Sequence, residues 1–163
     1  MIARQIAVPQ DALLHRYATQ EGTYTDCFEV MLPVNATMEE FVVAFYTTWL
    51  FRLERLVLSA ARRRRITDAQ VRALASGETD AFAVWQVEAR APGQLLLADD
   101  SGHTRSYLAL VGKKGGVARL IFGSAVVPRE GQQMPAWVRA TIPLHKFYSK
   151  ALLRLAERRL RRG

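Results

Sequence analysis

The side chains best suited to chemistry cluster around one predicted turn, at Asp99, Asp100, His103 and Arg105. An acid, an imidazole and a guanidinium within seven residues can transfer protons or hold an anionic group. The same residues also suit a solvated turn, because Asp and Gly favour tight turns without any catalytic role. Asp99 and Arg105 also suit an ion pair between neighbouring strands. The solvated turn is the favoured interpretation.

Metal and nucleophile chemistry find little support in the remaining side chains. His15, His103 and His145 lack the spacing of metal ligands and the chain has one cysteine, Cys27, so we predict no metal site. Cys27 lies in a predicted strand with no histidine nearby, which favours a buried, inert thiol. His145 lies beside an apolar helix stripe and is predicted to be a packing residue. The sequence has no serine elbow, phosphate loop or dinucleotide fingerprint, so catalytic residues stay unknown and no cofactor is predicted.

A strand and a helix are predicted near the start of the chain. The residues from Tyr24 to Leu32 alternate between two sides, which predicts a strand that Pro33 ends. Thr37 and Glu40 have the spacing of a capping box, in which each side chain bonds the other's free backbone amide. A helix is therefore predicted to begin at this point.

The helical region is predicted to break once and to continue into a shorter helix. The dipeptide Thr47-Thr48 is a weak helix former, which predicts two helices or one bent helix ending in the run Arg62 to Arg65. A second capping box, Thr67 with Gln70, begins a short helix that Gly77 ends.

The second half of the chain is predicted to be a run of strands followed by one helix. The strands are Phe82 to Arg90, Gln94 to Asp99, Thr104 to Val111 and Val117 to Val127. The connections are too short for parallel crossovers, so the strands must be antiparallel neighbours. An amphipathic helix is predicted from about Pro143, with one apolar stripe facing the sheet. That stripe comprises Leu144, Phe147, Tyr148, Ala151, Leu152 and Leu155.

The last predicted strand is apolar on both sides. An antiparallel sheet with a wet outer face alternates more cleanly, so part of the outer face is predicted to be covered. Self-association is the simplest cover, which predicts a homodimer through the outer sheet face.

This order of elements resembles the helix-grip fold of the SRPBCC superfamily, which includes START lipid-binding domains, polyketide cyclases and pathogenesis-related plant proteins. The resemblance covers Tyr24 to Leu160 and rests on element order. The segments Tyr24 to Phe28, Leu53 to Leu56 and Phe122 to Pro128 further resemble a bacterial family with no assigned activity. The resemblance implies an α+β helix-grip fold, one domain over residues 1–163, with an antiparallel sheet curved around the C-terminal helix. Five strands are counted where the superfamily usually shows seven, and Gln5 to Val8 are predicted to supply one more.

In this superfamily the gap between the sheet and the last helix commonly holds an apolar ligand. Large apolar side chains with polar handles suit such a site, although they serve equally as plain core. The candidate ligand-binding residues are Trp85, Arg105, Tyr107, Phe122, Ser124 and Tyr148. The predicted function is therefore binding of a small apolar or lipid-like molecule. One alternative is an interaction protein that contacts an anionic surface or partner through basic helix ends. Another is a cyclase- or hydrolase-type enzyme that uses the same cavity; an enzyme is the less favoured prediction.

The formal net charge of +8 comes mostly from Arg62 to Arg65 and from Arg158, Arg159, Arg161 and Arg162. Cations at helix C-termini complement the helix dipole, and they also attract anionic membranes weakly. Nucleic acid is less favoured, because no aromatic residue follows Tyr148 to stack on bases. The chain shows no signal-peptide pattern and no segment long enough to span a bilayer, and it has a single cysteine, which together predict a cytoplasmic protein.

Overall fold

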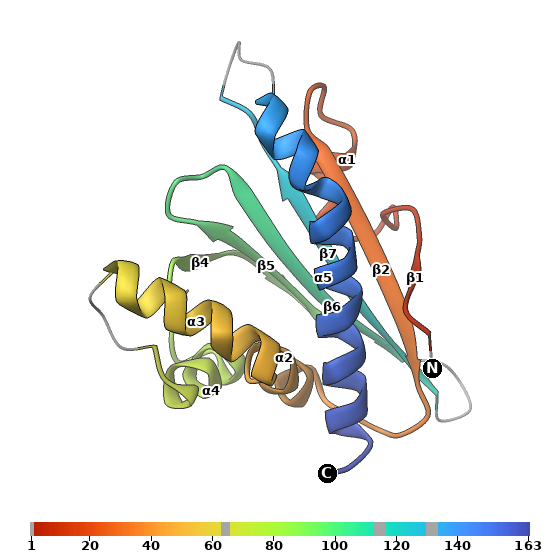
Figure 1. Cartoon of the computed structure of the whole chain (residues 1–163). Helices are drawn as coiled ribbons and strands as arrows, with labels where there is room; N and C mark the ends of the chain where they lie inside the picture. The colour runs from red at the N-terminus through yellow and green to blue at the C-terminus, as the bar shows by residue number, and fades with distance from the viewer. Residues whose placement is uncertain (1, 63–65, 113–116, 130–133) are drawn as a thin grey trace.

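The computed structural model describes residues 2–62, 66–112, 117–129 and 134–163, with residues 57–62 and 137 described by their backbone alone. Its elements are β1 (Arg4–Gln5), α1 (His15–Ala18), β2 (Tyr24–Leu32), α2 (Met38–Tyr46), α3 (Trp49–Arg62), α4 (Asp68–Ser76), β3 (Ala81–Phe82), β4 (Trp85–Ala91), β5 (Gln94–Asp99), β6 (Thr104–Gly112), β7 (Ala118–Val126) and α5 (Ala136–Leu160). The strands form one antiparallel sheet in the order β1-β2-β7-β6-β5-β4-β3. The long helix α5 crosses one face of this sheet (Figure 1). The α+β helix-grip arrangement is thereby confirmed.

Both predicted capping boxes are present and begin helices. The Thr37 hydroxyl accepts the backbone amide of Glu40 at 3.2 Å, and the Glu40 carboxylate accepts the amide of Thr37 at 2.7 Å. Thr67 and Gln70 repeat this arrangement at the start of α4, which Gly77 ends in the left-handed conformation. The local sequence therefore sets where α2 and α4 begin.

The predicted break between α2 and α3 is also confirmed. The hydroxyls of Thr47 and Thr48 donate to the carbonyls of Val43 and Phe45, at 2.6 and 3.0 Å. The Thr48 hydroxyl then accepts the amide of Phe51 at 3.2 Å and so supports the first turn of α3. The break lets α3 leave the sheet that α2 covers (Figure 1). The predicted Arg run at the end of this helix includes residues 63–65, which lie outside the described residues.

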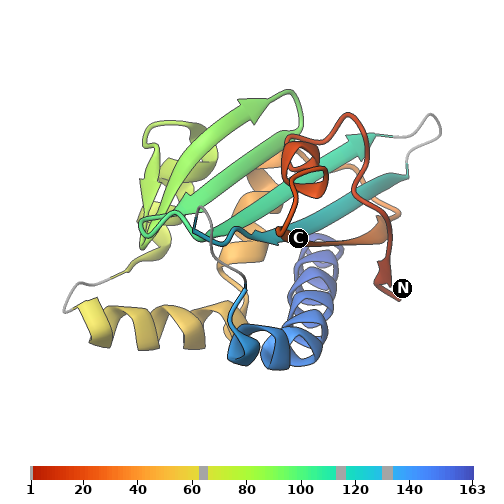
Figure 2. The same cartoon turned by 90° about the horizontal axis from the view of Figure 1, so that it is seen from above.

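Three predicted boundaries are wrong. The strand predicted at Gln5 to Val8 is the shorter β1, Arg4–Gln5, which pairs with β2. The strand predicted from Phe82 to Arg90 is two strands, because Ala83 has a φ of 56°, a value that interrupts extended backbone. The last helix begins at Ala136 and contains Pro143, rather than beginning near it. Proline fits helical φ, but it removes the hydrogen bond to the carbonyl of Arg139 and its ring clashes with that carbonyl. The helix therefore continues through Pro143 with a bend. Figure 2 shows the first turns of α5 at an angle to the rest.

Side chains alternate between an inner sheet face, covered by helices, and an outer face. Phe28, Leu108 and Phe122 lie in the inner core with residues of α2, α4 and α5. On the outer face, the chain's own N-terminal segment, residues 2–20, packs over Cys27, Tyr107, Ile121 and Ala125 through Leu14 and Tyr17. The apolar outer side of β7 is therefore covered within one chain, and the predicted homodimer stays a prediction.

Close packing on this outer face explains two residues. A Cβ atom at Gly123 would lie 2.6 Å from Cδ2 of Leu14 and 3.0 Å from the carbonyl oxygen of Asp26, so a larger residue would force Leu14 to move. Cys27 is buried, and burial, followed by the Asp26 charge, raises the pKa of its thiol to about 12, which makes it inert at neutral pH. No helix in the described part of the chain is both long enough and apolar enough to cross a bilayer.

Candidate functional site

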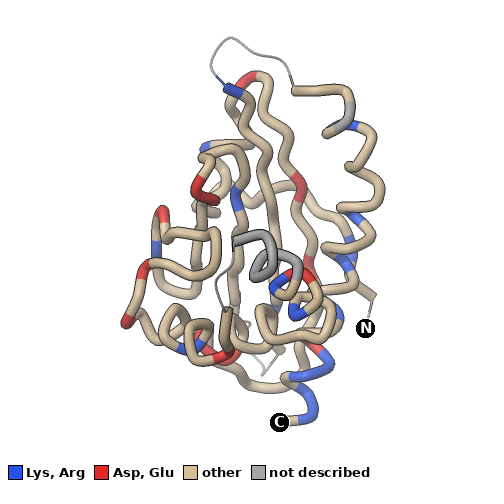
Figure 3. Tube along the Cα trace, turned by 60° about the vertical axis from the view of Figure 1, so that its left-hand side comes forward, with Lys and Arg blue, Asp and Glu red and all other residues tan. Residues whose placement is uncertain are grey.

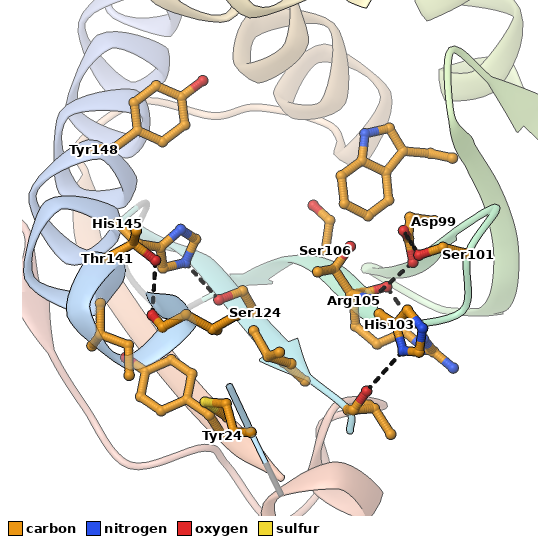
Figure 4. Close-up of a pocket in the computed structure, with 18 of the residues that line it drawn as sticks. Tyr24, Asp99, Ser101, His103, Arg105, Ser106, Ser124, Thr141, His145 and Tyr148 are labelled. Carbon is orange, nitrogen blue, oxygen red and sulfur yellow. Dashed lines mark hydrogen bonds between the residues drawn. The ribbon is translucent and has the colours of Figure 1, made fainter. Parts of the chain in front are cut away.

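A cavity of about 700 Å³ lies among the inner sheet face, α3 and α5 (Figure 4). It exists because α3 diverges from the sheet after the Thr47-Thr48 break, so that no helix fills the space between α3 and α5. Its walls are mainly apolar, with Phe45, Phe51 and Leu152 beside Phe122 of β7. Phe45 and Phe122 pack with ring centroids 4.8 Å apart. The rings give the cavity a rigid apolar floor.

Five of the six predicted ligand-binding residues line this cavity: Trp85, Arg105, Phe122, Ser124 and Tyr148. Tyr107 does not line it: its side chain lies in the outer core, where its hydroxyl donates to Gln94 at 2.7 Å. Neighbouring residues of a strand point to opposite faces, and the sequence did not show which face of β6 is inward.

Arg105 borders the cavity, but its guanidinium is committed elsewhere. Its Nε lies 2.5 Å from the carboxylate of Glu88 and donates to the hydroxyl of Tyr17 at 2.9 Å. The alternative of an ion pair between Asp99 and Arg105 is wrong, because Arg105 pairs with Glu88. Arg105 is therefore a structural cation and offers the cavity no free charge.

The turn cluster at residues 99–105 behaves as a structural turn. The Asp99 carboxylate accepts the backbone amide of Thr104 at 2.8 Å and the hydroxyl of Ser101. Burial raises the pKa of Asp99, but these hydrogen bonds outweigh it and hold the pKa below its ordinary value. A ring nitrogen of His103 lies 3.2 Å from the carbonyl of Val127. These bonds tie the β5–β6 turn to the end of β7.

A polar cluster that the sequence analysis missed lies on the opposite wall of the cavity. Asp26 of β2 and Ser124 of β7 are cross-strand partners, and the Ser124 hydroxyl donates to Asp26 Oδ1 at 2.6 Å. His145 of α5 points into the cavity, with its Nε2 2.8 Å from Ser124 Oγ and 3.4 Å from Asp26 Oδ2 (Figure 4). Tyr24 donates to the same Asp26 oxygen at 3.0 Å. The Asp26 side chain is wholly buried.

One signal for this cluster was present in the sequence. Asp26 occupies the same side of its strand as Phe28 and Val30, where an apolar residue is expected, and a buried carboxylate must have hydrogen-bond partners. Burial raises the pKa of Asp26, but the bonds from His145 and Ser124 outweigh it and hold the pKa below its ordinary value. Asp26 is therefore an ionised group, and His145 does more than pack.

These hydrogen bonds determine the tautomer of His145. The hydrogen of Ser124 points to Asp26, so the Ser124 oxygen must accept a hydrogen from His145 Nε2. An ionised Asp26 beside Nε2 also requires a hydrogen on that nitrogen. In the neutral ring the lone pair therefore lies on Nδ1. Every hydrogen bond that the ring makes within the described residues uses Nε2.

This arrangement is not the triad of a serine hydrolase. Such a triad needs serine to donate to one histidine nitrogen while the carboxylate accepts from the other. In this protein both Ser124 and Asp26 face Nε2, and Ser124 donates to the carboxylate. Ser124 therefore has a carboxylate, and not a histidine nitrogen, as its hydrogen-bond acceptor, which is the feature that separates this cluster from a triad.

A second carboxyl group, Glu54 of α3, lines the cavity and accepts the hydroxyl of Tyr148 of α5. Burial raises the pKa of Glu54, and the bond from Tyr148 lowers it only in part. The indole Nε1 of Trp85 is buried and has no hydrogen-bond partner among the described residues. Within the described part of the chain, no set of three or more His, Cys, Asp or Glu side chains is placed to hold a metal ion.

The class defined by this structure is a helix-grip α+β protein with an apolar internal cavity that carries a few polar groups. Comparisons with protein-family models, curated proteins and solved structures found no match for this chain.

Proposed function

We propose that this protein binds a small, largely apolar molecule in the cavity between the sheet, α3 and α5. The observation that carries the proposal is the cavity itself, whose volume of about 700 Å³ lies among those of small-molecule sites. Its aromatic and aliphatic walls exclude water from a ligand of matching shape. The resemblance of the element order to ligand-binding helix-grip proteins supports the same function.

The polar groups of the cavity favour a neutral ligand with a hydrogen-bond acceptor. The unpartnered Trp85 Nε1 is a donor that a carbonyl or hydroxyl oxygen of the ligand would satisfy. The acidic groups Glu54 and Asp99 also line the cavity, and the cation of Arg105 is paired with Glu88. A carboxylate or phosphate head group would meet the ionised carboxylate of Asp99 and no unpaired cation at Arg105, so anionic lipids fit less well.

Two measurements test the proposal. Native mass spectrometry of protein purified from cells should show bound apolar mass, and the neutral dye N-phenyl-1-naphthylamine should gain fluorescence on titration. Ile142→Trp should weaken dye binding at least tenfold, because Ile142 lines the cavity and is half-buried. Leu144→Trp is the matched control, since Leu144 lies on the exposed side of the same helix. Equal dye binding by both variants, with no bound mass, would refute the proposal.

A second candidate function, contact with an anionic membrane, is favoured by exposed apolar side chains on α3 and α5. Trp49, Leu53, Leu144 and Phe147 are between 54% and 73% exposed, which is unusual for such large apolar residues. Lys and Arg residues also gather at the C-terminal end of α5 (Figure 3). Aromatic residues and cations together suit a lipid surface.

A further inference from the structure

We propose that the cavity is also catalytic, with His145 Nδ1 as a general base and Glu54 as a general acid that together enolise a bound carbonyl compound. This inference rests on the proposed binding function and names its substrate class, an apolar ketone or aldehyde. It follows from the hydrogen-bond directions around His145 and from the placement of two carboxyl groups in unlike surroundings.

The base is defined by the groups around His145. The titratable and polar groups that surround its ring come from four elements: Asp26 and Tyr24 of β2, Ser124 of β7, Glu54 of α3, and Tyr148 and Ser149 of α5. Asp26 and Ser124 hold a hydrogen on Nε2, which leaves the Nδ1 lone pair as the proton acceptor. The ring projects into the cavity (Figure 4), and Asp26 stabilises the imidazolium that forms when Nδ1 takes a proton.

The acid lies close to this base. Tyr148 is three residues after His145, so both side chains lie on the same side of α5, and Tyr148 donates to Glu54. Burial favours the neutral form of the Glu54 carboxyl, whereas Asp26 is held ionised by its hydrogen bonds. A carboxyl group that burial keeps neutral can act as the acid, while an ionised carboxylate bonded to histidine supports that histidine as the base.

The reaction balances without any cofactor. His145 Nδ1 removes a proton from the carbon next to the carbonyl, and the C–H electron pair becomes a C=C bond. The carbonyl π pair moves to oxygen, which takes the proton of Glu54. The imidazolium of His145 exchanges its proton with water. The enol returns to the ketone when His145 delivers a proton to the same carbon or to a conjugated carbon, and Glu54 recovers its own. The net result is hydrogen exchange or double-bond migration.

The probe for this activity is 2-tetralone, a neutral bicyclic ketone with exchangeable protons. Loss of its α-proton signals in D₂O is followed by NMR, and its binding is measured separately by displacement of N-phenyl-1-naphthylamine. Wild-type protein should bind 2-tetralone and accelerate the exchange with saturation. His145→Gln should lower the accelerated rate at least a hundredfold with little change in binding, since general bases contribute about 10²–10⁴-fold. Glu54→Gln should lower it about tenfold or more.

His103→Gln is the matched control, because His103 borders the same cavity but bonds the carbonyl of Val127. It should leave the exchange rate unchanged. Binding of 2-tetralone without acceleration, or equal losses in His145→Gln and His103→Gln, would overturn the catalytic inference and leave the binding function intact. If neither the dye nor 2-tetralone binds, the catalytic inference and the proposed binding function are both overturned. Dye binding without 2-tetralone binding would overturn the carbonyl substrate class and therefore the catalytic inference. It would leave the binding function intact.

Asp26 is a positioning residue, and its role has a spectroscopic signature. In wild-type protein, histidine ¹⁵N spectra should show Nε2 protonated and Nδ1 unprotonated in neutral His145. Asp26→Asn should mix the tautomers and lower the exchange rate at least tenfold, whereas Ser124→Ala keeps the carboxylate and should change the rate only a few-fold. An unchanged tautomer in a folded Asp26→Asn protein would contradict the positioning role, as would an Nδ1-protonated wild type.

Discussion

The two faces of the sheet bury carboxylates in different ways. On the outer face, Glu29 pairs with Arg4 and Arg119, and Glu88 pairs with Arg105 and Arg16. On the inner face, Asp26 and Glu54 have no arginine partner among the described residues; they bond to serine, histidine and tyrosine beside an open cavity.

This difference separates carboxylates that stabilise the fold from carboxyl groups that can take part in chemistry. Arginine stays charged throughout the accessible pH range, so a carboxylate paired with it is held ionised and does not exchange protons with a ligand. Histidine, tyrosine and a partly buried glutamate can change protonation or hydrogen-bond direction when a ligand binds. The outer face, packed by the N-terminal segment, stabilises the fold, while the inner face holds groups able to act on a guest molecule.

The largest expected effect comes from the outer face. Leu14→Ala should lower the free energy of unfolding by about 2–5 kcal/mol, because Leu14 is fully buried against Gly123 and leaves a cavity there. Urea denaturation measures the loss, and dye binding by the folded variant should stay within twofold of wild type. Leu144→Ala, at an exposed position, is the control and should change little. A large loss of dye binding in Leu14→Ala would show that the faces are coupled.

Asp26→Asn should lower the free energy of unfolding by about 2 kcal/mol at neutral pH, as expected for lost hydrogen bonds to a charged group. The folded-state pKa of Asp26 lies below its ordinary value, so its stabilisation is present above that ordinary value and disappears as the pH falls through the folded pKa. Urea denaturation at neutral and acidic pH should therefore show the two proteins converging in acid. A difference that does not depend on pH would contradict an ionised Asp26.

Glu54→Gln should have a smaller effect of the opposite sign. Burial raises the folded-state pKa of Glu54, so wild-type protein loses stability as the pH rises from the ordinary value of glutamate through the raised one. The variant avoids this loss, and it should match wild type in acid and be slightly more stable at neutral pH. The same denaturation series measures it. Lower stability of Glu54→Gln at neutral pH would instead assign Glu54 a structural role like that of Glu29.

The smallest effects are expected at the basic tail. All four arginines of the tail are exposed, but Arg159 donates to the carbonyl of Thr47 and Arg161 pairs with Glu157. Arg158 and Arg162 make no such bond among the described residues. Replacing Arg158 and Arg162 by Gln should weaken co-sedimentation with anionic vesicles by about 1–2 kcal/mol at low salt, since each exposed cation contributes about 1 kcal/mol near such a surface.

Phe147→Ser is the companion variant for this experiment, because Phe147 is a highly exposed apolar residue on the same helix. Vesicle binding that survives both changes, or that ignores salt and lipid charge, would remove the membrane candidate. Neutral vesicles serve as the reference.

The element boundaries that the sequence predicted well depend on contacts within a few residues. The capping boxes at Thr37 and Thr67 and the break at Thr47-Thr48 involve bonds between residues at most four apart, so the local sequence contains the information. Pro143 led to a wrong prediction of where α5 begins. The free-energy cost of proline inside the helix is smaller than the stabilisation from packing α5 on the sheet.

The candidate site depended on contacts between distant parts of the chain. Sequence composition supplied Trp85, Phe122, Ser124 and Tyr148 as candidate cavity residues, but not the inward face of β6, and so it included Tyr107. No pattern in the sequence predicts that the N-terminal segment packs against the outer face of the sheet. Asp26, Ser124 and His145 become one cluster only because β2 pairs with β7 and α5 crosses both strands. Hydrogen-bond direction and burial are properties of that arrangement, so only the tertiary structure could decide which nitrogen of His145 is free.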